Sequence, residues 1–139
     1  MNYAEHLREM LKRHEGIVLK PYTDSVGKIT IGVGRNLTDN GITMQEVEFL
    51  LEHDIKLAEL YASSYEWFNS LVEARKAVIV SMLFNMGPRR FGQFRRLHAA
   101  ISAGHFDSAA AEMLDSTWHN QVGRRAEELS ELFRIGVWR

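Results

Sequence analysis

Glycines at 27, 32, 34 and 41 interrupt short β-branched runs between Ile17 and Ile42. Such runs favour strands, and the glycines between them favour tight turns, so this segment predicts a small antiparallel sheet of hairpins. The rest of the chain has the apolar spacing of helices. The predicted fold class is therefore α+β: a small antiparallel sheet lobe, a long connecting helix and a larger all-helical lobe.

Helical patterns lie on both sides of the sheet segment. In the first, over residues 1–14, Asn2 is placed to cap the start, and Gly16 suits the left-handed backbone that ends a helix. A second helix is expected to begin at Thr43, with Glu46 completing a capping box, and to run to about residue 62. That length suffices to join two lobes, and a cleft between such lobes is a natural ligand site.

The stretch that follows Ser70 is apolar almost all round as far as Met86, which predicts a helix buried at the centre of its lobe. Ser70 and Glu73 have the spacing of a further capping box. Shorter helices are expected over 95–103, 106–115 and 124–133. One domain, 1–139, then divides into a β-rich lobe at about 15–42, a connecting helix at about 43–62, and a helical lobe formed by 1–14 and about 63–139.

Composition excludes several kinds of function. The 139 residues include no cysteine, which rules out disulfides and thiol catalysis. The six histidines are scattered without the spacing of metal ligands, so we expect no metal and no cofactor; His53, His98, His105 and His119 are read as surface or helix-cap residues. The first 13 residues are polar, and no apolar run is long enough to cross a bilayer, so neither an export signal nor membrane insertion is expected.

The near-neutral net charge of -1 hides an asymmetry. Residues 1–69 hold 7 Lys and Arg against 11 Asp and Glu, whereas residues 70–139 hold 10 against 7. The basic excess is concentrated in the pairs Arg89-Arg90, Arg95-Arg96 and Arg124-Arg125. Such pairs suit an anionic polymer such as cell wall or nucleic acid, but solvated helix faces are the more common explanation.

Two carboxylates and a hydroxyl are the candidates for catalysis. Glu15 ends the first helix, where the macrodipole disfavours ionisation and so favours a general acid. Asp24 lies in the first hairpin region, where it is more solvated, and Thr30 follows on the next strand with a hydroxyl suited to hold water. Glycoside hydrolysis uses two carboxyls in different environments. By themselves, a Glu before a helix-stop Gly and an Asp in a turn are more often structural.

The order of residues around these candidates resembles a known family. The pattern Glu-x8-Asp-x5-Thr, filled by Glu15, Asp24 and Thr30, is similar to the signature of the phage-type lysozymes, glycoside hydrolase family 24, typified by the T-even phage enzyme. The resemblance continues over most of the chain, in His14-Glu15-Gly16, Lys20-Pro21-Tyr22-Thr23-Asp24, Thr30-Ile31-Gly32-Val33-Gly34, Ser81-Met82-Leu83-Phe84-Asn85-Met86-Gly87, Trp118-His119-Asn120-Gln121 and Phe133-Arg134-x-Gly136-x-Trp138.

This resemblance implies hydrolysis of the β-1,4 bond between N-acetylmuramic acid and N-acetylglucosamine in peptidoglycan. It implies Glu15 as general acid, with Asp24 and Thr30 holding the attacking water. Substrate contacts are implied at Gly34, Phe84, Asn85 and Arg125, with Arg125 pairing with the catalytic glutamate across the cleft.

The sequence departs from the family at three places. Arg35 stands where the family often has a histidine that pairs with an aspartate of the long helix; Asp54 matches that aspartate, so an Arg35–Asp54 pair is expected. Residues 36–43 form a shorter connection than in the T-even enzyme, which predicts a more open cleft on that side. Val26 replaces an acidic cleft residue.

The leading interpretation is an endolysin that is made in the host cytoplasm and acts on the wall in the periplasm. It would need a separate holin for membrane passage and is expected to be a monomer. A non-catalytic wall-binding module with the same fold is the alternative, and nucleic-acid binding through the arginine pairs is disfavoured by the total charge. Three tryptophans, Trp67, Trp118 and Trp138, are expected to pack in the core or between lobes.

Overall fold

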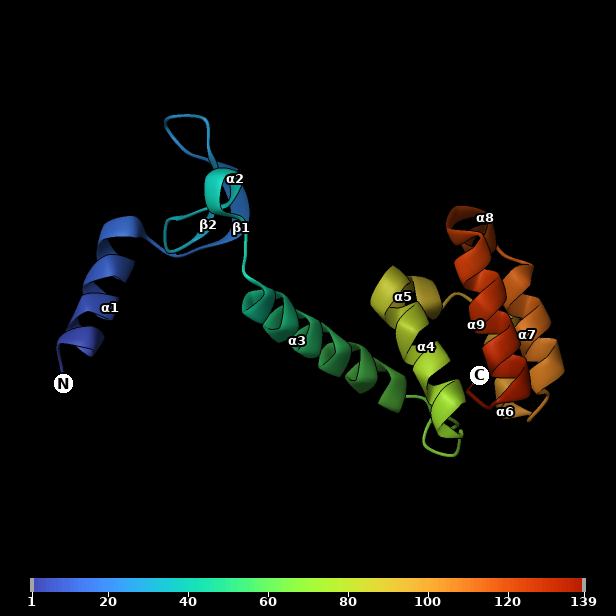
Figure 1. The fold of residues 1–139 in the computed structure, drawn as a ribbon. Helices are drawn as coiled ribbons and strands as arrows, with labels where there is room; N and C mark the ends of the chain where they lie inside the picture. Colours follow the sequence, from blue (N-terminus) through green and yellow to red (C-terminus); the bar gives the residue numbers. More distant parts are fainter. Residues whose placement is uncertain (1, 139) are drawn as a thin grey trace. The chain divides into compact units, whose positions relative to one another are not determined.

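The computed structural model describes residues 2–138, and the chain divides into two compact units. The first ends at Phe49 and the second begins at Leu50, so the boundary falls inside the helix α3 (Met44–Ser63). Figure 1 shows the helices and strands of both units. The assignment of residues 1–14 to the helical lobe stays a prediction.

The first unit contains a helix followed by a small antiparallel sheet, as the sequence predicts. Its strands pair in the order β1-β2-β3, and a one-turn helix follows the last strand (Figure 1). The elements are α1 (Tyr3–Glu15), β1 (Val18–Thr23), β2 (Ile29–Gly32), β3 (Arg35–Asn36) and α2 (Leu37–Asn40). The helical turn α2 lies at the end of the segment Ile17–Ile42, which the sequence analysis predicted to form hairpins, so that part of the prediction was wrong.

Both predicted ends of α1 are confirmed. The side chain of Asn2 accepts a hydrogen bond of 3.0 Å from the backbone N–H of Glu5, which satisfies one of the free donors of the first turn. Gly16, with φ of +78°, ends the helix, and its N–H donates to the carbonyl of Lys12 at 2.9 Å. The last residue of the helix is therefore Glu15.

The register of the sheet places Thr30 at its centre. Thr30 lies opposite Tyr22 of β1 and opposite Asn36 of β3. Within the described part of the first unit it is the one buried residue, with 4% of its surface exposed. A period of two along β2 makes the side chains of Ile29 and Ile31 point to the opposite face.

The start of α3 has the capping box that the sequence predicts. The Thr43 hydroxyl accepts from the N–H of Glu46 at 3.2 Å, and the Glu46 carboxylate accepts from the N–H of Thr43 at 2.9 Å. Two backbone donors of the first turn are thereby satisfied reciprocally.

The second unit is helical and holds the hydrophobic core. Met82, Trp118 and Phe133 are fully buried in it, and Ala58 and Ala62 of α3 join the same cluster. The helices α6, α7 and α9 lie side by side (Figure 1). The unit's remaining elements are α4 (Glu73–Met86), α5 (Pro88–Phe91), α6 (Arg95–Ser102), α7 (Phe106–Leu114), α8 (Thr117–Val122) and α9 (Arg124–Ile135).

The predicted start of the central helix was wrong. Helix α4 begins at Glu73 with Val72 in the capping position, and no side chain caps it. The Ser70 hydroxyl instead donates to the carbonyl of Trp67 at 2.9 Å. Ser70 therefore serves the preceding turn, because hydroxyl side chains bond readily to nearby backbone groups outside helices.

Candidate active site

Glu15 lies at the C-terminal end of α1, and its side chain lies against the turn between β2 and β3. A Cβ atom added to Gly34 would lie 2.8 Å from Oε2 of Glu15, which is closer than such atoms approach. Gly34 also has φ of +66°, a conformation that residues with a Cβ rarely adopt. Gly34 is thus the residue that lets the Glu15 carboxylate rest against the backbone of this turn. Its predicted contact with substrate stays a prediction.

Asp24 follows β1 and is fixed by the turn that it begins. Its Oδ1 accepts two backbone hydrogen bonds, from Val26 at 3.0 Å and from Lys28 at 2.8 Å. The backbone closes the same turn, since the N–H of Asp24 donates to the carbonyl of Lys28 at 2.8 Å. Among the described residues, no partner binds Oδ2. One oxygen therefore fixes the carboxylate, and the other is free to accept a hydrogen bond.

The hydroxyl of Thr30 is oriented by the same turn. It donates to the carbonyl of Lys28 at 3.1 Å. Because its proton is used in this bond, the oxygen keeps lone pairs with which to accept a hydrogen bond. Lys28 thus connects Asp24 and Thr30 through its backbone alone.

These three residues provide two distinct carboxyl environments close to one turn-rich sheet. One oxygen of Asp24 accepts two backbone N–H bonds. Glu15 has no hydrogen-bond partner among the described residues and is exposed at the negative end of a helix dipole. A proton donor and a water-holding carboxylate are the pair of groups that hydrolysis of a glycosidic bond requires.

Phe84, Asn85 and Arg125, predicted to bind substrate, all lie in the second unit. Phe84 is 44% exposed at the end of α4. The side-chain oxygen of Asn85 accepts a hydrogen bond of 2.9 Å from the indole N–H of the buried Trp118. Arg125 is exposed near the start of α9. Asn85 thus has a packing role, and the pairing of Arg125 with Glu15 stays a prediction.

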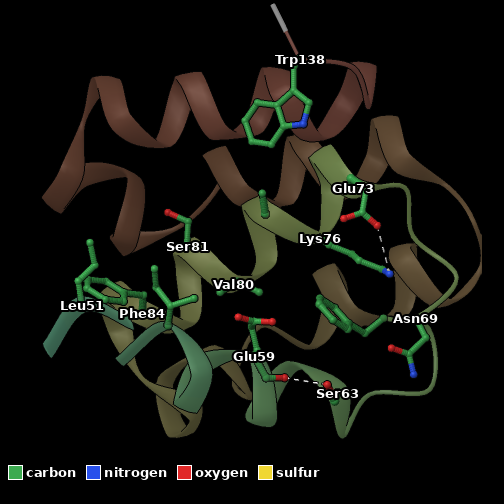
Figure 2. A pocket seen from close by; sticks show the side chains of 13 residues that line it. Leu51, Glu59, Ser63, Asn69, Glu73, Lys76, Val80, Ser81, Phe84 and Trp138 are labelled. Carbon is green, nitrogen blue, oxygen red and sulfur yellow. Dashed lines mark hydrogen bonds and ion pairs between the residues drawn. The ribbon is translucent and has the colours of Figure 1, made fainter. Parts of the chain in front are cut away.

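A pocket of about 790 Å³ opens in the second unit, between the C-terminal half of α3 and α4. Figure 2 shows Phe84 and Val80 at its wall and Trp138 at its edge. Two of its polar side chains form an ion pair, with 3.6 Å between Nζ of Lys76 and Oε1 of Glu73. Its lining combines apolar side chains such as Val80 with the carboxylates of Glu59 and Glu73. None of Glu15, Asp24 and Thr30 lines it.

Arginines from two of the three pairs of the C-terminal half line the same pocket. Arg90, Arg95 and Arg96 line a pocket of about 430 Å³, whose other wall contains Glu112 and Asp115. None of these three arginines makes an ion pair with a described residue, although Arg90 donates to the side chain of Gln121. Arg90, Arg95 and Arg96 are thus cations that share one pocket with two carboxylates.

Arg35 pairs with Glu46, a partner that the sequence analysis did not name. Its guanidinium forms a bidentate pair with Glu46, with Nη1–Oε1 and Nη2–Oε2 distances of 2.9 Å, and donates to the carbonyl of Gly41 at 3.2 Å. The hydrogen bonds from Arg35 and the backbone of Thr43 lower the pKa of Glu46 to about 2. The sequence indicated Glu46 as a capping residue but gave no sign of this second role. The expected pair of Arg35 with Asp54, which belongs to the second unit, stays a prediction.

The interpretation of His98 as a surface or cap residue was also wrong. The imidazole is half-buried among rings, with centroids 4.7 Å from those of Tyr65 and of Phe91, and Nε2 donates to the Phe91 carbonyl at 2.8 Å. Burial raises the pKa of the neighbouring Tyr65 phenol. An isolated histidine in an amphipathic helix gives no sequence signal that separates these two locations.

The tryptophans divide between core and surface. Trp118 is fully buried, as expected, whereas Trp138 is 61% exposed. In the part of the chain that the structure describes, no group of His, Cys, Asp and Glu is arranged to hold a metal ion. No helix there has the length and apolar character needed to cross a membrane.

The family of wall-cleaving enzymes suggested by this site is confirmed by comparison with known proteins. The phage lysozyme family matches residues 12–133, which include Glu15, Asp24, Thr30 and every predicted substrate residue. The chain belongs to the phage lysozyme family, and its class is that of a lysozyme-type muramidase acting on peptidoglycan.

Individual relatives extend over nearly the whole chain. "Probable T4-type lysozyme 2" and "Probable T4-type lysozyme 1" of Dictyostelium discoideum are each 27% identical to it, over 94% of this chain and 95% of the relative. The "Pre-baseplate central spike protein Gp5" of Enterobacteria phage T4 is 28% identical over 94% of this chain, but the match covers only 28% of that protein. The alignments with the Dictyostelium proteins span 161 positions against 139 residues here, so this chain has gaps relative to them.

Proposed function

We propose that this protein hydrolyses the β-1,4 bond between N-acetylmuramic acid and N-acetylglucosamine, with Glu15 as general acid and with Asp24 and Thr30 positioning the attacking water. The observation that carries the proposal is that Asp24, whose Oδ2 has no partner among the described residues, and the Thr30 hydroxyl, whose own proton is already used, both bond to the backbone of Lys28. Both oxygens accept hydrogen bonds, so they suit the two hydrogens of one water molecule.

The reaction then follows from these roles. Glu15 donates its proton to the glycosidic oxygen as the bond to the anomeric carbon breaks. Asp24 and Thr30 hold the water by its hydrogens, so that a lone pair of its oxygen faces that carbon, and Asp24 accepts a proton as the water attacks. Attack by water from the opposite face inverts the anomeric configuration. Phe84, Asn85 and Arg125 are proposed as contacts of the saccharide or of Glu15.

The biological role we propose is that of a phage endolysin. The protein would be synthesised in the host cytoplasm and reach the wall when a separate holin permeabilises the membrane. It would act as a monomer. The central spike protein of phage T4 contains a segment that matches this chain, within a longer protein. This match supports an alternative role of the domain as part of a phage particle.

The test is a turbidity assay on outer-membrane-permeabilised bacteria with wild type, Glu15→Gln and Asp24→Asn. Loss of a positioned acid or base typically costs about 10²–10⁴-fold, so both variants are expected to lyse cells at least about a hundredfold more slowly. Sedimentation with purified peptidoglycan checks that both still bind. Lysis by Glu15→Gln within twofold of wild type would refute the mechanism, and binding without lysis by wild type would favour the non-catalytic wall-binding module.

A further inference from the structure

The segment between β3 and α3 makes side-chain contacts to the strand that carries Thr30. Thr38 of α2 accepts a hydrogen bond of 2.8 Å from the backbone N–H of Ile29. Asp39 of α2 pairs through Oδ1 with the ammonium group of Lys28 at 3.1 Å. Ile29 and Lys28 are the two residues that immediately precede Thr30.

The opposite side of Thr30 is tied to the same helical turn. Asn36, the cross-strand neighbour of Thr30, donates from its amide to Oδ2 of Asp39 at 2.8 Å. It also caps α2, because its side-chain oxygen accepts from the N–H of Asp39 at 3.0 Å. Asp39 therefore connects Lys28, two residues before Thr30, with Asn36, the residue opposite Thr30 on β3.

These contacts replace a missing part of the sheet. Strand β3 has two residues and pairs only with Thr30 and Ile31, so no backbone carbonyl of β3 reaches the N–H of Ile29. The Thr38 hydroxyl supplies that acceptor. An unpaired strand N–H left in this position would let the end of β2 separate from its neighbours.

Lys28 connects the contacts made by α2 with the proposed catalytic groups. Its N–H donates to Oδ1 of Asp24, and its carbonyl accepts from the Thr30 hydroxyl, at 2.8 Å and 3.1 Å. Any shift of the Lys28 peptide changes the distance between the two oxygens that are proposed to hold the water. A displacement of about 1 Å in such groups lowers a rate by about a hundredfold.

We infer that Thr38 and Asp39 are positioning residues, which act through Lys28 and Ile29 to hold Asp24 and Thr30 in the geometry for binding water. The inference rests on the proposed function of those two residues. The short connection 36–43 thus supports catalysis by positioning Asp24 and Thr30, although none of its own residues is proposed to be catalytic.

The decisive comparison is Thr38→Val against Thr38→Ser. Valine has nearly the same shape but no acceptor for the Ile29 N–H, whereas serine keeps the hydroxyl. With soluble glycan strands from peptidoglycan as substrate, Thr38→Val is expected to lower kcat about tenfold with KM within twofold, and Thr38→Ser to restore wild-type kcat. Asp39→Ala is expected to act in the same direction. Asn40→Ala, on the same turn, exposed and outside this network, is the control.

Two further measurements separate positioning from folding and from the proposed function. Amide hydrogen exchange at Ile29 and Lys28 should accelerate in Thr38→Val while the melting temperature stays within about 2 °C of wild type. A wild-type kcat in Thr38→Val, or a loss of activity that follows thermal unfolding and is not restored by serine, would overturn the inference. Retained activity in Glu15→Gln would instead refute the proposed function, whatever the Thr38 variants do.

Discussion

At the scale of single residues, Gly34 shows how the absence of a side chain places a carboxylate. Gly34 must be glycine for two separate reasons. Its φ is positive, and a Cβ atom at this position would lie 2.8 Å from Oε2 of Glu15. Gly32, two residues earlier, shares the first reason but not the second, since a Cβ there would meet nothing within 4 Å. Alanine at position 32 therefore tests the backbone strain alone, whereas alanine at position 34 tests the strain together with the contact to Glu15.

We expect Gly34→Ala and Gly32→Ala each to lower the free energy of unfolding by about 1–3 kcal/mol, since both impose a positive φ on alanine. Only Gly34→Ala should also reduce the rate of wall lysis, because it alone displaces the Glu15 carboxylate. Denaturant unfolding and the turbidity assay provide the measurements. Equal activity of the two variants would mean that Gly34 does not position Glu15.

Met82 tests the location of the core. It is fully buried in α4, so Met82→Ala should destabilise the protein by roughly 2–5 kcal/mol. Met44→Ala, at an exposed position at the start of α3, should have little effect. Thermal melting of both variants checks this, and an unchanged midpoint for Met82→Ala would contradict the assignment of the core.

At the scale of elements, the junction between β3 and α3 is held by charge. Arg35 lies in β3 and Glu46 in the first turn of α3, and their bidentate pair adds to the capping box of Thr43. An acidic residue in the first turn also interacts favourably with the helix dipole. The arginine therefore fixes where α3 begins relative to the sheet within the first unit.

The pair predicts a dependence of stability on acid pH. The folded-state pKa of Glu46 is lowered from 4.5 to about 2, mainly by the hydrogen bond from Arg35. Its contribution is therefore complete above pH 4.5 and is lost as the pH falls through about 2, because the unfolded state then binds the proton more readily. Arg35 stays charged, so no corresponding loss is expected near neutral pH.

Glu46→Gln is expected to remove this part of the acid dependence, as measured by urea unfolding between pH 2 and pH 7. Glu52→Gln, which removes a carboxylate from an exposed pair with Lys56 on the same helix, serves as the control. Parallel pH profiles for wild type and Glu46→Gln would show that the ion pair does not contribute to stability.

At the scale of the whole molecule, burial is divided unequally between the two units. The core of the second unit includes Trp118, Phe91 and Phe133, whereas Thr30 is the one buried residue in the described part of the first. Local stability follows the amount of buried apolar contact. The proposed catalytic residues thus belong to the less buried unit.

Hydrogen exchange should report this difference. The amides of β1 and β2 are expected to exchange at least about tenfold faster than those in the middle of α4, since opening the sheet exposes little apolar surface. Mass spectrometry of exchanged peptides from both segments gives the comparison. Equal protection in the sheet and in α4 would mean that the two units unfold as one.

The sequence by itself determined the elements whose signals are local. The capping residues Asn2 and Thr43, the glycine at 16 and the β-branched runs predicted α1, α3 and the sheet correctly, because helix caps and strand periodicity involve residues a few positions apart. The order of Glu15, Asp24 and Thr30 likewise indicated the family before any geometry was known.

Only the tertiary structure decided which side chains meet. In the structure Arg35 pairs with Glu46, His98 lies among aromatic rings, and Gly34 lies against Glu15. The helical turn α2 was missed, since four residues carry too little periodic pattern to predict a helix. The three side-chain contacts join residues from different elements, and their energies depend on distance and burial, which a pattern of residue types does not contain.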